Sequence, residues 1–342
     1  MQLPIQVTFN RCNPPNGRST LAARIRLARH LSIYEAQMIP PRLLDLLRSC
    51  ENTETSHFPP TELFNEGWML RLVLDAIQKL ELDDHPLRFL PQSRWYSEAR
   101  MASPFAPRSR GDNLGEGFTH ADAVIGHFAF DPLKRAGLHL IETARQFVVV
   151  EAKMFSNLST GTTNATEYDQ AARNVACMAR AVSRSGRHID DFEQIGFFVL
   201  APELKRRQSR NTNLEGCATA VSIRENISRR IIAYENTSRA EARDLRAWET
   251  AYLLPVIEKM DRSHNLRVLS WDDCVSTIAK RDNAIGGELQ CFYAKCLEFD
   301  RQPPLSSDLN CHQLGARPLP GGLPEHLNHL SEFISNNWVS QP

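Results

Sequence analysis

The sequence predicts an α/β fold, in which short apolar strands alternate with amphipathic helices. Two apolar runs have the length of strands, Phe147 to Val150 and Ile195 to Leu200. The unbroken β-branched run in the first is typical of a strand that is covered on both faces. Over 61–81 and 167–184, apolar residues recur every three or four positions, which is the spacing of one helix face. This alternation indicates a sheet with helices packed against it.

The chain is long enough for one large domain, or for a core with elaborations. It has 342 residues, of which 42% are hydrophobic, so it can bury a substantial core. We expect an N-terminal elaboration over 1–60 and the core over 61–202. Residues 203–300 are expected to extend the same domain with helices and one strand, and 301–342 are a tail rich in proline and glycine.

Each element has a local signal. A helix over 61–81 follows the capping sequence Pro59-Pro60-Thr61-Glu62 and carries apolar residues at helical spacing from Leu70 onward. The helix over 167–184 has a similar apolar face. Strands are predicted at Trp95–Met101, Ala121–Phe130, Phe147–Lys153, Ile195–Leu200 and Leu266–Trp271, and the last is followed by helices from Asp272 to Phe299.

Charge and composition exclude several classes of function. The 40 basic and 40 acidic residues cancel, so any nucleic-acid surface has to be local. No apolar run approaches the roughly 20 residues that a membrane helix needs, and the first ten residues lack the pattern of a signal peptide. We therefore expect a cytoplasmic protein without a membrane partner. The eight cysteines are scattered without a C-x-x-C pair, which favours reduced thiols over a zinc site.

Four charged residues stand at the edges of the predicted core. Glu151 and Lys153 end the most apolar strand and project to the same side, because strand side chains alternate. Asp122 lies near the start of the preceding strand. Glu66 lies four residues before Leu70, on the apolar face of its helix. Each residue has an alternative interpretation. Glu151 and Lys153 could mark a strand end that becomes charged where it meets water, and Asp122 could be a turn residue. Glu66 could be a first-turn residue stabilised by the helix N-terminus.

Three carboxylates and one lysine make chemical sense together. Hard carboxylate oxygens select Mg²⁺ or Mn²⁺, and such a metal can bind a phosphate, activate a water and neutralise charge at phosphorus. Lys153 can orient or help deprotonate the attacking water, and it can offset charge on the phosphate. The sequence has no G-x-x-x-x-G-K-[ST], G-x-S-x-G or H-E-x-x-H motif, so nucleotide triphosphate, serine-nucleophile and zinc-protease chemistries are not indicated.

With these residues, the chain resembles the PD-(D/E)XK nuclease superfamily over about residues 61–200. The resemblance implies a restriction-endonuclease-like fold with a central four-stranded mixed sheet flanked by helices. It also implies that Asp122 and Glu151, with help from Glu66, bind the metal, and that the protein cleaves a nucleic-acid backbone. The residue before Asp122 is Ala121 rather than proline, which makes the motif less specific.

The helix after the Glu151-Ala-Lys153 triplet adds to this resemblance. Exonuclease-like members of the superfamily often carry a glutamine here that orients a site residue or contacts nucleic acid, and Gln170 is the candidate. Arg173 lies one turn on and is a candidate phosphate ligand. Solvent exposure without a role is the alternative for both residues.

The resulting hypothesis is a magnesium-dependent nuclease, a hydrolase that binds DNA and acts in genome maintenance or in defence against foreign DNA. RNA is left open as a substrate. The alternative from another class is a catalytically inactive nucleic-acid-binding or interaction module on the same fold. A homodimer is a further expectation, because cutting both strands of a duplex favours two-fold symmetry.

Overall fold

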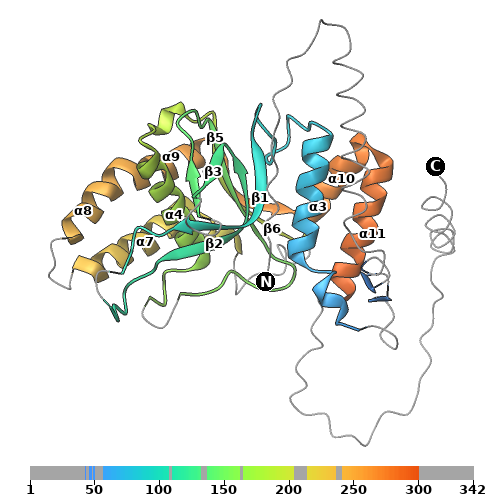
Figure 1. Cartoon of the computed structure of the whole chain (residues 1–342), viewed down its shortest axis with the longest axis horizontal. Helices are drawn as coiled ribbons and strands as arrows, with labels where there is room; N and C mark the ends of the chain where they lie inside the picture. Colours follow the sequence, from blue (N-terminus) through green and yellow to red (C-terminus); the bar gives the residue numbers. More distant parts are fainter. Residues whose placement is uncertain are drawn as a thin grey trace, which may run out of the picture. The chain divides into compact units, whose positions relative to one another are not determined.

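A five-stranded mixed sheet lies between two layers of helices (Figure 1). The computed structural model describes residues 57–299, with gaps at 108–109, 132–136, 162–164, 204–213 and 236–240, together with residues 43, 46, 47, 49 and 50. All of these residues belong to one compact unit. Most of the predicted N-terminal elaboration over 1–60, and the predicted tail over 301–342, lie outside the described residues.

The strand order of the sheet is β1-β2-β5-β6-β7. The β1–β2 and β2–β5 pairs are antiparallel, and the β5–β6 and β6–β7 pairs are parallel. The sheet therefore has one strand more than the four that the resemblance implied. The strands are β1 (Arg94–Ala102), β2 (Phe118–Gly126), β5 (Gln146–Ala152), β6 (Gln194–Ala201) and β7 (Leu266–Ser270).

The predicted strand from Ala121 to Phe130 is interrupted at Gly126. This residue has φ +148°, and a Cβ built on it would lie 2.1 Å from the carbonyl oxygen of Gln146, so only glycine fits the turn. Beyond the turn, β3 (Phe128–Phe130) leaves the main sheet and pairs with β4 (Leu138–Leu140) in a second, two-stranded sheet.

Helices cover both faces of the main sheet (Figure 1). One layer holds α3 (Glu66–Lys79), α10 (Trp271–Arg281) and α11 (Asn283–Phe299), which pack on one another. The other holds α4 (Gln170–Ser185), α7 (Ala220–Glu235), α8 (Glu241–Trp248), the π-helical η3 (Glu249–Leu253) and α9 (Leu254–Arg262). The short elements are η1 (Pro60–Glu62), η2 (Ile189–Asp191) and α6 (Leu214–Cys217).

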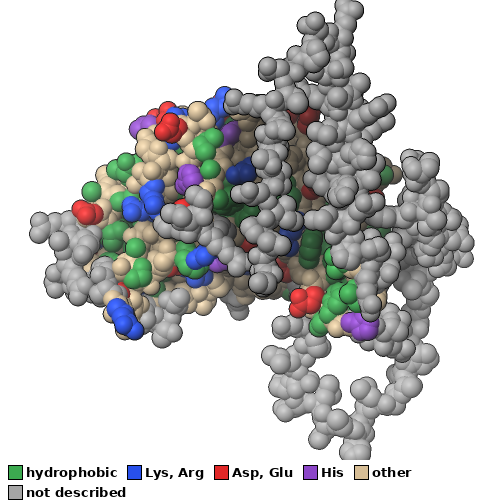
Figure 2. Space-filling view, viewed as in Figure 1, with side chains coloured by type: hydrophobic (Ala, Val, Ile, Leu, Met, Phe, Trp, Pro, Cys, Tyr) green, Lys and Arg blue, Asp and Glu red, His purple; other side chains and the backbone are tan. Residues whose placement is uncertain are grey.

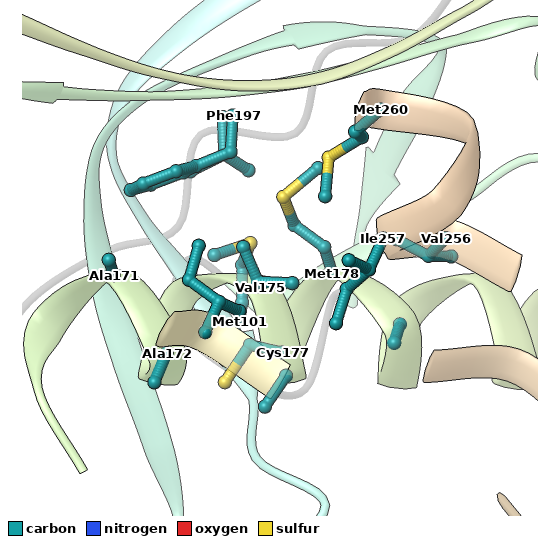
Figure 3. Packing of buried hydrophobic residues seen from close by; sticks show 14 of the residues in the cluster. Met101, Ala171, Ala172, Val175, Cys177, Met178, Phe197, Val256, Ile257 and Met260 are labelled. Atoms are coloured by element: carbon teal, nitrogen blue, oxygen red, sulfur yellow. The ribbon is translucent and has the colours of Figure 1, made fainter. Parts of the chain in front are cut away.

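Each face of the sheet has its own hydrophobic cluster. Phe147 and Val149 of β5 belong to the cluster on the α4 side, and Val148 and Val150 belong to the cluster on the α3 side. The strand is buried on both faces, which explains its unbroken apolar run. Figure 3 shows the α4-side cluster, where Phe197 of β6 lies above α4 and Met260 enters from α9.

The alternation of side chains in β1 and β2 shifts at one level of the sheet. Ala99 and Ala121 pack in the α4-side cluster, but Ala123 packs in the α3-side cluster. The shift falls between them, where Glu98 has φ +56°. The register pairs Ser97 with Ala123 and Ala99 with Ala121, and it leaves out Glu98 and Asp122. A positive φ at a residue other than glycine costs of order 1–3 kcal/mol, and such positions cluster at functional sites.

No helix among the described residues is both long enough and apolar enough to cross a membrane. On the face that Figure 2 shows, the basic and acidic side chains of the described residues are scattered among one another. This mixture agrees with the zero net charge of the chain, and it means that a binding surface has to be sought residue by residue.

A buried histidine between α3 and β1 makes the stability of the fold depend on pH. Burial, and to a smaller degree Arg267, lowers the pKa of His85 from 6.5 to about 4. Its Nδ1 accepts a hydrogen bond of 3.1 Å from the Leu87 amide. Between pH 6.5 and 4 only the unfolded chain takes up the proton, so we expect the free energy of unfolding to fall as pH falls, by about 1.4 kcal/mol per pH unit and about 3 kcal/mol in total.

Urea titrations at several pH values test this expectation, with His85→Gln as the variant that cannot titrate. The variant should lose the steep part of the pH dependence between 6.5 and 4 while keeping the remainder. If the two proteins lose stability in parallel as the pH falls, His85 is not the group responsible.

Candidate active site

The candidate site is built at the end of β5, the central strand of the sheet. Ala123 of β2 faces Val150 of β5, and continuing this register by one pair sets Asp122 opposite Glu151. Side chains directly opposite in an antiparallel pair lie about 5 Å apart at their Cβ atoms. The two carboxyl groups are close enough to share a hydrogen bond. Asp122 Oδ2 also accepts a hydrogen bond of 2.8 Å from the Ala152 amide.

Lys153 reaches back to Glu151 from the same strand. Its Nζ lies 2.7 Å from Glu151 Oε1, and only 10% of its side chain is exposed. Two backbone hydrogen bonds hold the residue: its amide donates to the Leu200 carbonyl at 2.8 Å, and Trp271 Nε1 donates to its own carbonyl at 3.0 Å. The lysine is therefore positioned by β6 and α10 as well as by its own strand.

The first turns of α4 supply two amides to Glu151. Asp169 caps this helix by accepting a hydrogen bond from the Ala172 amide, so Gln170 is its first residue. Gln170 Nε2 donates to Glu151 Oε1, and Asn174 Nδ2, one turn later, donates to Oε2 at 3.0 Å. The fully buried Glu151 carboxyl group is thus held by one ammonium and two amide groups.

The structure places Arg173 beside the loop after β5 and gives it no contact with Glu151. Its Nη2 donates to Ser159 Oγ at 2.7 Å, and its charge acts on Glu116 and on Asp169. Ser159 also binds Gln170, because its amide donates to Gln170 Oε1 at 3.1 Å. Gln170 and Arg173 therefore share the same loop, but only Gln170 touches the carboxyl pair.

Glu66 lies at the first position of α3, and the helix begins later than the predicted 61–81. Asn65, not the segment over 59–62, caps the helix by accepting a hydrogen bond of 3.0 Å from the Trp68 amide. Glu66 is half-buried, and its negative charge acts on Lys153. Among the described residues no ion pair within 4.0 Å joins the two, so Glu66 acts on Lys153 only through its charge at a longer distance.

The pKa values of the buried groups reflect a site with more carboxyl groups than cations. Burial first, and then the neighbouring Asp122, raises the pKa of Glu151 to about 8, although Lys153 opposes this shift. Burial lowers the pKa of Lys153, but the carboxylates of Glu151, Asp122 and Glu66 outweigh burial and raise it above its ordinary value. The lysine is therefore a permanent cation at neutral pH.

The donor set is of the kind that can hold a hard divalent cation. The carboxylate oxygens of Asp122 and Glu151 are those that Mg²⁺ and Mn²⁺ prefer, and a cation between them would offset the repulsion between the two groups. Asp122 and Glu151 would hold the metal, with Glu66 the next carboxylate. In the part of the chain that the structure describes, no three His, Cys, Asp or Glu side chains are already arranged as metal ligands.

Asn174 is the site residue that sequence reasoning missed. It is fully buried and lies on α4 among apolar residues such as Val175 and Met178. The available signal was a polar side chain within an apolar helical face, one turn after Gln170. A buried amide of this kind needs a polar partner, and here the partner is Glu151.

We expect Asn174→Ala to destabilise the fold. The variant leaves one oxygen of the buried Glu151 without its donor, a loss of about 1–3 kcal/mol in the free energy of unfolding, to be measured by urea denaturation. Asn226→Ala is a matched control, because Asn226 also donates to a carboxylate, Asp169, but from a half-buried position. Equal losses in both variants would contradict a special role for the Glu151 contact.

The chain has no match among known proteins in three comparisons: no family model, no curated protein and no solved structure matches it. The chain is therefore described by what its own residues show: an α/β unit with a five-stranded mixed sheet, and a buried carboxyl pair with a lysine at the end of the central strand.

Proposed function

We propose that this chain is a magnesium-dependent nuclease of the PD-(D/E)XK type, with a restriction-endonuclease-like core that hydrolyses the phosphodiester bonds of DNA. The observation that carries the proposal is the convergence of Asp122, Glu151 and Lys153 from two strands, with Gln170 on the helix that follows. Burying the Glu151 carboxylate with Lys153 costs desolvation free energy, so this pair contributes little to the stability of the fold. Buried charged groups with shifted pKa values are typical of catalytic sites, which supports a chemical role for the cluster.

Each side chain has a separate role in the proposal. Lys153 remains charged, so it orients the attacking water and offsets negative charge at phosphorus rather than accepting a proton. Gln170 and Asn174 hold the Glu151 carboxyl group in one orientation. Hydrolysis forms a bond from the water oxygen to phosphorus and breaks a bond to one sugar oxygen, with the proton of water released to solvent and the leaving oxygen protonated.

A divalent metal bound by Asp122 and Glu151 would supply activation of the water and neutralisation of the phosphate. Binding it requires Glu151 to turn at least one oxygen away from its present donors, because Lys153 and Gln170 both donate to Oε1 and Asn174 donates to Oε2. Oε2 is held by the neutral amide of Asn174, so freeing this oxygen costs less than breaking the ion pair between Oε1 and Lys153.

The same contacts favour a second candidate, a nucleic-acid-binding module without turnover. Both oxygens of Glu151 are already hydrogen-bonded, and the described residues contain no ready-made group of three metal ligands. A site that never binds metal would have this geometry. Lys153 would then serve only to neutralise a buried carboxylate.

A cleavage assay separates the two candidates. The full chain is incubated with supercoiled, linear and single-stranded DNA and with RNA, each with Mg²⁺, Mn²⁺ or EDTA. The nuclease proposal expects cleavage with Mg²⁺ or Mn²⁺ and none in EDTA. Binding without cleavage under every metal condition would establish the second candidate, and Mn²⁺ titration by calorimetry would show whether the site takes metal at all.

A further inference from the structure

Two exposed aromatic side chains, each contacted by an arginine, lie near the candidate site. Trp68 on the first turn of α3 is 43% exposed, and Phe118 at the start of β2 is 44% exposed. The guanidinium carbon of Arg71 lies 4.9 Å from the centre of the Trp68 ring, and that of Arg100 lies 3.5 Å from the centre of the Phe118 ring. Exposed aromatic rings paired with basic groups are the arrangement that binds unpaired bases.

The two pairs are anchored at neighbouring positions of β1. Arg71 Nε donates to Ser97 Oγ at 2.9 Å, which fixes the first pair beside Ser97. Arg100 is itself on β1, three residues further along, so the anchors are separated by roughly 10 Å of strand. Because the side-chain alternation of β1 shifts at Glu98, Ser97 and Arg100 face the same side of the sheet.

The candidate site falls between the two pairs. Asp122 lies between Ala121 and Ala123, which pair with Ala99 and Ser97 of β1, so its level on β1 is between the positions of Ser97 and Arg100. Trp68 is two residues from Glu66 on the same helix turn. A strand of nucleic acid that contacts both aromatic rings would therefore pass the carboxyl pair with a few nucleotides between its two stacked bases.

The negative charges at this surface favour contact with the bases of a nucleic acid over contact with its phosphates. Glu66, Glu98 and Asp122 are all negative, and Arg71 is partly neutralised by Glu98, whose Oε1 lies 3.8 Å from its Nη2. Phosphates alone would be held weakly by such a surface. Bases are uncharged and present a flat π-face, and they are free to stack on protein only where they are unpaired.

We propose that Trp68 and Phe118 are stacking platforms for a single-stranded segment of DNA or RNA on either side of the candidate site. The inference rests on the proposed function and specifies its substrate as a strand with unpaired bases. His120, whose ring centre lies 5.5 Å from that of Phe118, borders the same platform.

Fluorescence anisotropy with labelled oligonucleotides tests the proposal in EDTA, where no cleavage occurs. The probes are a single-stranded DNA, a single-stranded RNA and a DNA duplex without ends that unpair. Trp68→Ala and Phe118→Ala should each weaken single-strand binding about tenfold and leave duplex binding unchanged. Trp68→Phe and Phe118→Tyr should restore binding, because they keep an aromatic face.

The control is Val221→Ala, which removes an exposed apolar side chain from α7, and urea denaturation checks that each variant is folded. Unchanged single-strand binding in both alanine variants, or equal losses on single strand and duplex, would overturn the stacking proposal. Cleavage of any nucleic acid by the unmodified chain would still support the nuclease. A chain that neither binds nor cleaves any probe contradicts both proposals.

Discussion

Lys153→Ala is expected to lower the cleavage rate by roughly a hundredfold or more, to the point where cleavage is effectively lost. Metal and nucleic-acid binding should be largely retained. Lysine is not a ligand of Mg²⁺, so its loss acts on the attacking water and on the charge of the transition state, an effect of about 3 kcal/mol. The ammonium group lies 2.7 Å from Glu151, inside the site and away from bulk solvent. Cleavage rates and calorimetric Mn²⁺ titration measure the two properties separately.

Lys79→Ala is the matched control, because Lys79 lies at the other end of α3 and its exposed side chain pairs with Asp75 on the same helix. It should cleave at the rate of the unmodified chain. Lys153→Arg tests the geometry, since arginine keeps the charge but its planar group does not fit the place of an ammonium. Turnover by Lys153→Ala at the unmodified rate would rule out the catalytic assignment.

Asp122→Asn is expected to remove metal binding together with cleavage. The amide oxygen of asparagine can still accept the hydrogen bond from Ala152, so the strand pair is kept. The variant has one carboxylate fewer for Mg²⁺, which tolerates an incomplete ligand set badly. We expect the increase in melting temperature that metal produces in the unmodified chain to disappear in the variant.

In EDTA, the same variant should be at least as stable as the unmodified chain. Asp122 raises the pKa of Glu151 because the half-buried Asp122 carboxylate repels the charged form of the buried Glu151, and replacing Asp122 with a neutral amide removes that repulsion. The expected gain is on the order of 1 kcal/mol. A large loss of stability would mean that Asp122 is structural, and an undiminished thermal shift with Mn²⁺ would mean that the metal binds elsewhere.

Local signals in the sequence were sufficient for the main elements. The apolar run before Glu151 predicted β5, and the helical spacing after Asp169 predicted α4, each within a few residues of the observed ends. Such patterns depend on neighbours along the chain, because burial of one or both faces leaves a period in the sequence. The strand over 266–271 was also predicted, but the pairing that makes β7 the fifth strand of the sheet leaves no local trace.

The sequence by itself determined that Glu151 and Lys153 share one side of a strand end, because alternation is a property of the strand. Only the tertiary structure decided which other groups meet them. It brought Asp122 and Asn174 to Glu151, turned Arg173 toward Ser159 and left Glu66 to act on Lys153 through its charge alone. These outcomes depend on strand register and on where a helix begins relative to the sheet, and both are set by packing between segments far apart in the chain.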